Sequence, residues 1–182
     1  MWVLGIETTT PSGSVALLHL PTAEAVPEVI AELPLEARNY AASLFSTTER
    51  ALTIAGITLA QVDLFAVADG PGSFTGERVG LTAVKAWIEV LGKPAVNIST
   101  LRAIGGPVAL MDAGRGDVYY GRYPPGDEGL APASDFTGNN VRRQSGLLAA
   151  QVARLGLADF TSGRALGPLQ LDARYLQRPA IS

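Results

Sequence analysis

The chain has 182 residues, of which 47% are hydrophobic and 17% charged, and it contains no cysteine. This composition is typical of a folded protein with a sizeable core, and it excludes disulfides, cysteine metal sites and thiol chemistry. No uninterrupted apolar run approaches about 18 residues, so the sequence predicts no membrane span. The first residues lack the basic region of a signal peptide, and we therefore expect a cytoplasmic protein.

The charge is divided unevenly along the chain. Residues 1–100 carry five basic and ten acidic side chains, a balance of −5, whereas residues 101–182 carry nine basic and seven acidic ones, a balance of +2. Tight binding of a nucleic acid usually requires a basic face. We therefore expect that this chain alone does not bind tRNA tightly.

Predicted strands and helices alternate through the first hundred residues. Short apolar runs predict strands at residues 2–6, 14–20, 28–35, 64–68 and 95–98. Apolar residues at three- and four-residue steps predict helices at 36–55 and 76–91, followed by a short helix that ends at Ile104. Gly56 and Gly92 follow the two longer helices, at the position of a C-cap. The first two strands form an antiparallel hairpin, and Glu7 ends the first of them.

The segment 69–80 joins a strand to the helix 76–91, and three glycines and a proline fall within seven of its residues. Ser73 or Thr75 is predicted to be the N-cap of this helix. The segment lacks the Gly-Lys-Ser/Thr ending of a Walker loop and the spacing of a dinucleotide-binding loop. The pattern therefore favours a structural loop over a phosphate-binding one. Gly80, inside the helix, indicates that another part of the backbone passes close by.

A second, shorter copy of the first hairpin is predicted after residue 106. Residues 107–112 form a strand that ends at Asp112, as the first strand ends at Glu7, and residues 117–123 return. Residues 124–140 are rich in loop formers, and a helix is predicted at 144–155, before Gly156. We therefore predict an N-terminal domain at 1–104 and a truncated C-terminal domain at 105–182.

The residues that could carry chemistry are few. His19 is the only histidine, and with no cysteine the chain cannot form an ordinary transition-metal site. Glu7, Asp69 and Asp112 end strands, so they could organise a metal or a phosphate, or simply accept hydrogen bonds from loop N–H groups. The sequence therefore predicts no cofactor and no catalytic residue.

Four stretches of the sequence resemble the TsaB (YeaZ) family. They are I-E-T-T-T-P-S-G-S-V-A-L-L from Ile6, G-P-G-S-F-T-G-E-R-V-G from Gly70, L-M-D-A-G-R-G-D-V-Y-Y from Leu110 and D-A-R-Y-L-Q-R from Asp172. The resemblance implies an α/β, duplicated actin-like (ASKHA, ribonuclease H-like) fold with a reduced second domain. It also implies that Glu7, Thr8 and Asp112 mark a vestigial nucleotide site.

The same resemblance implies a non-catalytic scaffold in the making of threonylcarbamoyladenosine in tRNA. Family members pair with a TsaD-like catalytic subunit through the two N-terminal helices and also work with a TsaE-like ATPase. The isolated chain is expected to be a monomer or a homodimer. The residues expected to bind the partner are Tyr40, Leu44, Phe45, Glu77, Arg78, Gly80, Leu81 and Val84.

Three features depart from the family pattern, and two other functions stay open. The helix after Ser99 is unusually short, because Gly105-Gly106-Pro107 ends it. Tyr40-Ala41-Ala42 replaces the usual His-Ser-Glu, and Glu77 stands where an apolar residue is common. The duplicated hairpins are also compatible with a degenerate actin-like kinase or ATPase. A peptidase-type enzyme is the other alternative, although the sequence shows no nucleophile or metal set for it.

Overall fold

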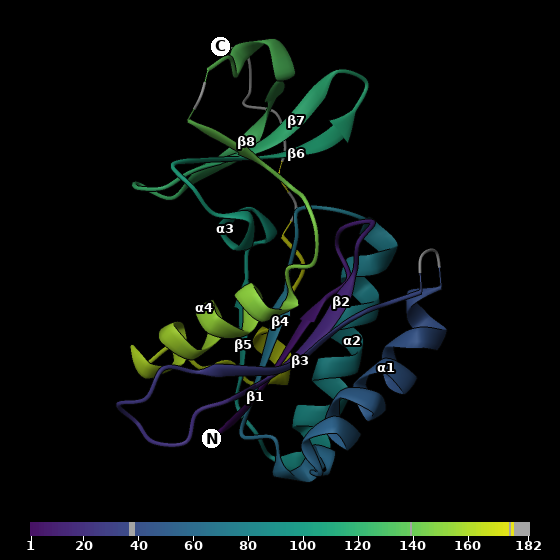
Figure 1. The fold of residues 1–182 in the computed structure, drawn as a ribbon. Helices are drawn as coiled ribbons and strands as arrows, with labels where there is room; N and C mark the ends of the chain where they lie inside the picture. The colour runs from purple at the N-terminus through teal and green to yellow at the C-terminus, as the bar shows by residue number, and fades with distance from the viewer. Residues whose placement is uncertain (37–38, 139, 175, 177–182) are drawn as a thin grey trace.

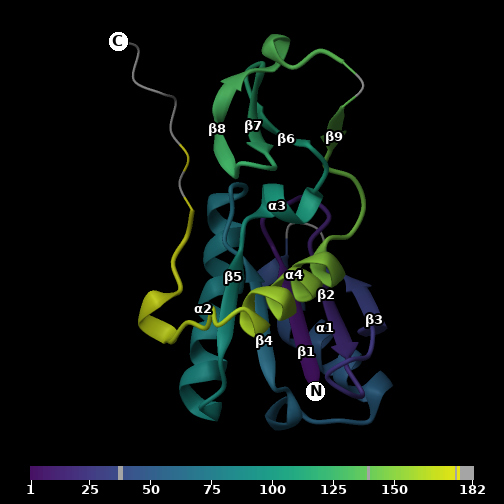
Figure 2. The same cartoon turned by 90° about the vertical axis from the view of Figure 1, so that its left-hand side faces the viewer.

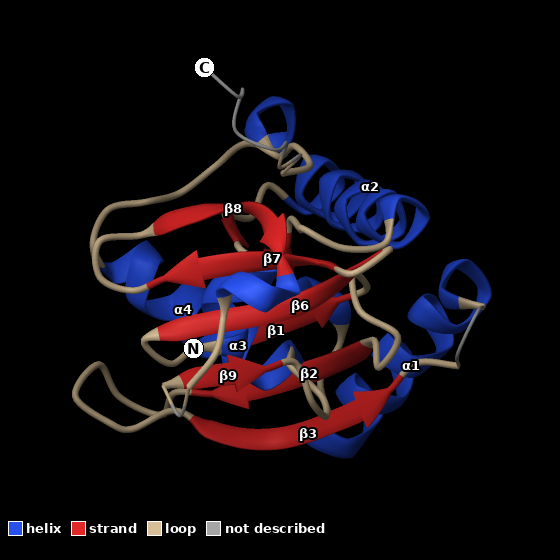
Figure 3. Cartoon of the chain, turned by 90° about the horizontal axis from the view of Figure 1, so that it is seen from above, coloured by secondary structure: helices blue, strands red, loops and turns tan. Residues whose placement is uncertain are grey.

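Two lobes, each built on a β-sheet, make up the computed structural model (Figure 1). The structure describes residues 1–36, 39–138, 140–174 and 176. We call the part built on the five-stranded sheet the large lobe and the part built on the four-stranded sheet the small lobe. Seen from above, the small sheet lies over the large one (Figure 3). The predicted α/β class is confirmed.

The sheet of the large lobe has the strand order β3-β2-β1-β4-β5. Its strands are β1 (Trp2–Glu7), β2 (Ser14–His19), β3 (Glu28–Pro34), β4 (Leu64–Ala68) and β5 (Ala95–Ile98). The first three are antiparallel neighbours, whereas β1, β4 and β5 are parallel. Because β1, β2 and β4 are buried along almost their whole length, they read as continuous apolar runs rather than as alternating ones.

Helices cover both faces of this sheet. α1 (Tyr40–Ala55) and α2 (Phe74–Leu91) lie on one face, and α4 (Ala149–Thr161) lies on the other (Figure 2). One core cluster fills the space between the sheet and the first two helices, and a second fills the space beneath α4. The predicted first helix began at Glu36, but the helix begins at Tyr40, and residues 37–38 lie outside the described part. No helix among the described residues is long and apolar enough to cross a bilayer.

The small lobe repeats the strand order of the large one. Its strands are β6 (Val108–Gly114), β7 (Asp117–Arg122), β8 (Asp127–Pro132) and β9 (Val141–Arg143), in the order β8-β7-β6-β9. The pairing of β6 with β7 is antiparallel and that with β9 parallel, as β1 pairs with β2 and β4. The short helix α3 (Thr100–Ile104) packs beneath this sheet. These matching orders confirm the predicted duplicated, actin-like fold.

The second copy differs from the prediction in two strands. Residues 124–140 were expected to be loops, yet β8 lies there, and β9 follows at Val141. Gly129 has no Cβ, and the Tyr120 ring of β7 packs against that position, so β8 is held by its neighbour rather than by its own apolar pattern. Among the described residues, only short 3₁₀ turns, η1 (Leu59–Gln61), η2 (Ala133–Asp135) and η3 (Pro168–Gln170), add to these elements. The position of α1 is thus taken by η2 in the second copy, which is reduced as expected.

The helix α4 belongs by sequence to the second half but packs on the first sheet. It contacts β1, β2, β4 and β5 of the large lobe. The division at residue 104 therefore separates the two sheets, while the chain returns to complete the first core. Gly156 was expected to end this helix but lies inside it. Glycine is needed at this position because a Cβ would come 2.5 Å from the Cβ of Ala66. The glycine is required for close packing of helix on strand.

Replacing Gly156 with valine should test this packing. A valine side chain would push α4 away from β4, and we expect a loss of about 1–3 kcal/mol in the free energy of unfolding, measured by denaturant titration. The matched control is Ala158→Val, at an exposed position of the same helix, which should cost less than about 1 kcal/mol. Equal losses in both variants would show that α4 does not depend on this close approach.

Candidate functional site

A cleft of about 960 Å³ lies between the two lobes. Its walls come from the β1–β2 turn, the first residues of α1 and α2, and the strands β6 and β7. The lining residues on the large lobe include Thr9, Thr10 and Tyr40, and those on the small lobe include Asp112 and Arg143. This is the hollow in which a duplicated fold of this kind could hold a ligand.

Glu7, at the end of β1, does not point into the cleft as a free acid. One carboxylate oxygen accepts hydrogen bonds from the Thr9 N–H at 2.5 Å, the Thr9 hydroxyl at 2.6 Å and the Thr10 N–H at 2.9 Å. The other oxygen accepts from the Thr10 hydroxyl at 2.6 Å. Burial raises the pKa of Glu7, and the bonds from Thr10 and Thr9 oppose this rise. Glu7 therefore serves as an internal acceptor for the turn.

The remaining parts of the turn are also occupied from within. The Tyr40 hydroxyl accepts from the Gly13 N–H at 3.0 Å and donates to the Thr10 carbonyl at 2.6 Å. The Thr9 carbonyl accepts from the Ser73 N–H at 2.8 Å. A phosphate needs several free N–H groups pointing at it. Three donors of this turn are instead bound to Glu7 and Tyr40, which disfavours phosphate binding.

The loop before α2 is pressed against the same turn. The Thr8 hydroxyl donates to the Gly76 carbonyl at 2.7 Å, and a Cβ on Gly76 would overlap the Thr8 carbonyl oxygen. Gly80 was predicted to face another part of the backbone, but it faces a side chain, since a Cβ on Gly80 would lie 2.5 Å from the Thr8 hydroxyl oxygen. Ser73 is the N-cap, as predicted, and accepts from the Gly76 N–H at 3.2 Å. Thr8 is thus buried as a packing residue.

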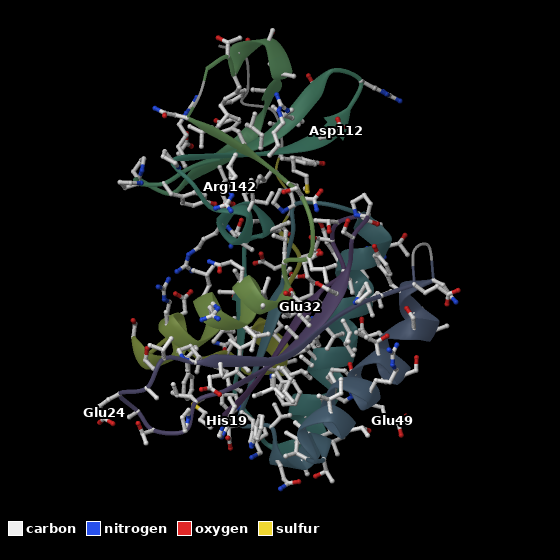
Figure 4. The ribbon with its side chains drawn as sticks, in the orientation of Figure 1. His19, Glu24, Glu32, Glu49, Asp112 and Arg142 are labelled. Carbon is white, nitrogen blue, oxygen red and sulfur yellow. The ribbon has the colours of Figure 1, made fainter. Side chains whose placement is uncertain are left out.

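Asp112 was expected to end its strand as Glu7 ends β1, but β6 continues to Gly114, so Asp112 lies inside the strand and pairs with Val118. It is exposed, and its carboxylate accepts from the Gly114 N–H at 2.8 Å. Figure 4 shows Asp112 on the small lobe and His19 far from it on the large lobe. The His19 ring stacks on Trp2, with the ring centroids 4.1 Å apart, as expected of a residue that packs rather than reacts.

Asp69, the third strand-end acid, is tied to the C-terminal segment. Its buried carboxylate accepts from Nε and Nη2 of Arg174 at 3.1 and 3.2 Å, and from the Asn97 amide at 2.6 Å. Burial raises the pKa of Asp69, while Arg174 and Asn97 lower it. The D-A-R-Y-L-Q-R stretch was the one signal of this contact in the sequence, although Tyr175, Gln177 and Arg178 lie outside the described residues.

Glu77 is buried beneath the loop that precedes α2, with 2% of its surface exposed. Its Oε2 atom has no hydrogen-bond partner among the described residues. Burial raises the pKa of Glu77 to about 7, the Asp69 carboxylate adds to the rise, and the Gly72 N–H opposes it. We expected Glu77 to rim a partner surface, but a partner cannot touch it in this position.

The other residues predicted to bind a partner divide in the same way. Leu44, Gly80, Leu81 and Val84 are buried within the large lobe, because the α1 and α2 stripes that carry them face the sheet. These four residues can therefore stabilise a partner surface only from the interior of the lobe, without touching the partner. Phe45 and Arg78 are exposed, and Tyr40 is half-buried at the cleft. The exposed surface therefore has to be built from other residues of the two helices.

No group of three or more His, Asp or Glu side chains that could hold a metal is found in the part of the chain that the structure describes. Among the described residues that line the cleft, Arg143 is the one cation and Asp112 the one carboxylate, and the hydroxyls of Thr9, Thr10 and Tyr40 are bound to neighbours. Acid–base or nucleophilic chemistry requires a free group within reach of a partner group. Asp112 and Arg143 are therefore the charged groups of the described cleft that such chemistry would have to use.

The chain is similar to known proteins over most of its length. The model of the family described as "TsaD: tRNA N6-adenosine threonylcarbamoyltransferase" matches residues 33–161. An uncharacterised protein of Mycobacterium tuberculosis is 33% identical over 136 residues, which cover 72% of this chain and 63% of that protein. The "tRNA threonylcarbamoyladenosine biosynthesis protein TsaB" of Escherichia coli (strain K12) is 29% identical over 140 residues, covering 71% of this chain and 58% of that protein. The chain therefore spans only about three fifths of the curated relatives it matches.

Among solved structures, YeaZ from Pseudomonas aeruginosa superposes with a TM-score of 0.79 at 23% identity. The superposition covers 96% of this chain and 99% of that one. A second structure, described as having similarity to peptidase YEAZ from Pseudomonas aeruginosa, gives a TM-score of 0.80 at the same identity. At this identity, the likeness establishes the fold.

The buried carboxyl of Glu77 should make stability depend on pH. Its pKa is about 7 in the folded chain and lower when unfolded, so the folded state holds more protons between these values. The stability that Glu77 contributes is therefore greatest at acidic pH and is lost as the pH rises towards 7. We expect Glu77→Gln to unfold at a higher temperature than wild type at pH 8 and to lose this advantage near pH 5.

The control for this measurement is Glu89→Gln, at an exposed position of the same helix. It should follow the wild-type dependence of the melting temperature on pH. If Glu77→Gln also runs parallel to wild type from pH 5 to pH 8, Glu77 does not titrate in this range.

Proposed function

Since this chain belongs to the TsaD family of tRNA N6-adenosine threonylcarbamoyltransferases and is a homologue of the TsaB (YeaZ) proteins, we propose that it is a non-catalytic scaffold subunit in the threonylcarbamoylation of adenosine in tRNA. Its partner would be a TsaD-like catalytic subunit, helped by a TsaE-like ATPase. The proposal includes a cytoplasmic location, no cofactor of its own, and no tight binding of tRNA by the isolated chain.

The observation that carries this proposal is an exposed, partly apolar face on α1 and α2. On α2, every fourth residue is exposed, in the series Phe74, Arg78, Thr82, Ala86 and Val90. Residues four apart lie on the same side of a helix, so these form one stripe. The stripe faces away from the sheet, since the buried residues of α2 lie on the other side. A helix that covers a sheet needs one apolar stripe, and the second indicates a partner.

The neighbouring helix extends this face. Phe45 of α1 is 57% exposed, and its ring meets Trp87 of α2 edge-on, with centroids 5.7 Å apart. Ala41 and Ala42, one turn earlier, are exposed and small enough for a second helix to approach. The Arg78 guanidinium lies 4.0 Å from the centroid of the Phe74 ring. Helix-on-helix pairing through this face could bury about 1,600 Å² in total, the standard size of a stable interface.

The first hairpin supports the same proposal, because its acid is not free to act on a ligand in the cleft. Glu7 and Thr8, which the resemblance assigned to a vestigial nucleotide site, are buried and bound within the large lobe. Asp112 faces the cleft without a matching acid from the first hairpin. A subunit of this kind would act by contact rather than by chemistry. In the absence of its partner, the same apolar face is also suited to a homodimer.

Phe45→Asp should disrupt the proposed interface. A charge placed in the centre of an apolar contact should weaken binding to the TsaD-like subunit by at least about tenfold, as measured by isothermal titration calorimetry with the purified proteins. Because Phe45 is exposed, the melting temperature of the isolated chain should change little.

The matched control is Val26→Asp, a still more exposed apolar residue (77% against 57% for Phe45) in the β2–β3 loop, away from α1 and α2. It should bind as wild type does. Unchanged affinity of Phe45→Asp would place the interface elsewhere, and equal weakening by both variants would point to a general effect of charge.

The purified chain alone should not hydrolyse ATP or peptides above background, because no side-chain cluster that could hold a metal is found among the described residues and Glu7 is bound within its own turn. The measurement is phosphate or peptide release from repurified protein. Activity that persists after repurification and disappears in Asp112→Asn would favour a kinase, ATPase or peptidase function instead.

A further inference from the structure

Residues 163–174 form a strap that leaves the end of α4 and runs along the large lobe towards the small one. Figure 2 shows the strap (yellow) passing α2 and rising beside the lobes. The family-like D-A-R-Y-L-Q-R stretch begins in it, and the proposed partner surface does not use it. Its last described contacts lie where the two lobes meet.

The strap is anchored on the large lobe at two points. Leu166 pairs with Ala95 of β5 as an isolated β-bridge, in which the Leu166 N–H donates to the Ala95 carbonyl at 2.8 Å. Further along, Leu171 is fully buried in the core cluster beneath α1 and α2. These anchors fix the path of the strap up to Asp172 without help from the small lobe.

Arg174 then joins the strap to two other segments, one in each lobe. Its guanidinium binds both carboxylate oxygens of Asp69, which directly follows β4, and its Nη1 lies 3.3 Å from Oε2 of Glu128 on β8. Its backbone N–H donates to the Asp69 carbonyl at 2.6 Å. Asp69 belongs to the large lobe and Glu128 to the small lobe. One cation therefore bridges the two lobes.

Neither acid forms an ion pair with another cation among the described residues. The Asp69 and Glu128 side chains are only 2% and 9% exposed, so losing the guanidinium would leave two carboxylates with little access to water. Glu128 also accepts a short hydrogen bond from the Tyr123 hydroxyl, within the small lobe. Removing Arg174 should therefore disturb the structure more than removing one partner of an exposed ion pair.

The covalent connection beside this bridge is permissive. The chain passes from α3 to β6 through Gly105 and Gly106, both with positive φ (74° and 85°). Glycine has no Cβ that clashes at positive φ, so the backbone φ and ψ angles can change there. The chain crosses between the lobes again between β9 and α4, where Leu148 packs in a core cluster with residues of α3 and β6. Rotation of the small lobe about these two connections would change the cleft.

We propose that the strap is a conformational latch: Arg174, by binding Asp69 and Glu128 together, fixes the small lobe on the large one and sets the width of the cleft between them. The latch is independent of the proposed partner surface on α1 and α2. It gives the C-terminal segment a role in the arrangement of the lobes.

The distance between the lobes tests the latch directly. The chain has no cysteine, so Glu49→Cys on α1 and Ser134→Cys on the small lobe give one pair of spin labels without background. Double electron–electron resonance then measures the distribution of label distances. We expect a narrow distribution in the otherwise wild-type chain, and a wider distribution or a second population when Arg174→Gln or Glu128→Gln is added.

The matched control is Arg164→Gln, also in the strap. Arg164 pairs with Asp159 of α4, within the large lobe, at 2.8 Å. Its distribution should remain narrow. If Arg174→Gln does not fold, Glu128→Gln decides the question. The proposal is overturned if the folded Arg174→Gln or Glu128→Gln variant gives the wild-type distribution, or if Arg164→Gln widens it equally.

Discussion

The fit of the loop before α2 against the β1–β2 turn is the constraint on which the rest of this structure depends. Gly76 allows the Thr8 carbonyl to approach the backbone of α2, and the Thr8 hydroxyl donates to the Gly76 carbonyl. This contact sets the direction of α2, and with it the stripe that begins at Phe74. The same contact covers the β1–β2 turn from one side, while on the other side the Glu7 carboxylate accepts hydrogen bonds from the N–H groups of the turn. The packing that orients the helix therefore also removes the means to hold a phosphate.

The two proposals concern different regions of this fold: partner binding concerns the exposed face of α1 and α2, and the latch concerns the cleft between the lobes. The face of α1 and α2 is exposed and partly apolar, and it needs no movement of the lobes to bind a partner. The cleft is bounded by both lobes, so its width depends on the glycine connection at residues 105–106 and on Arg174. Glu77 lies between these two regions, under the loop and near Asp69. Glu77 is buried in the first turn of α2, so its protonation affects both the loop above it and the helix that carries the proposed partner surface.

The sequence predicted most of the large lobe, because apolar runs and capping glycines depend on neighbours close in the chain. It also indicated the duplication through Glu7 and Asp112. It missed β8, whose residues acquire strand structure from β7, and it misread Gly156, whose role depends on Ala66, ninety positions away. The predicted surface included Leu44 and Val84 because spacing shows that a helix has two apolar stripes, but not which one the sheet covers. The exposed stripe of Thr82 and Ala86 escaped notice because it is small and barely apolar.

The most direct test of this account is the amount of threonylcarbamoyladenosine formed in tRNA by the TsaD-like and TsaE-like subunits with each variant of this chain, measured by mass spectrometry of digested nucleosides. Phe45→Asp changes the surface, and Asp112→Asn combined with Arg143→Gln changes the two charged groups of the cleft. The account predicts that Phe45→Asp abolishes the stimulation given by the wild-type chain and that the cleft variant retains it. Full stimulation by Phe45→Asp, together with its loss in the cleft variant, would contradict the account and place the function in the cleft.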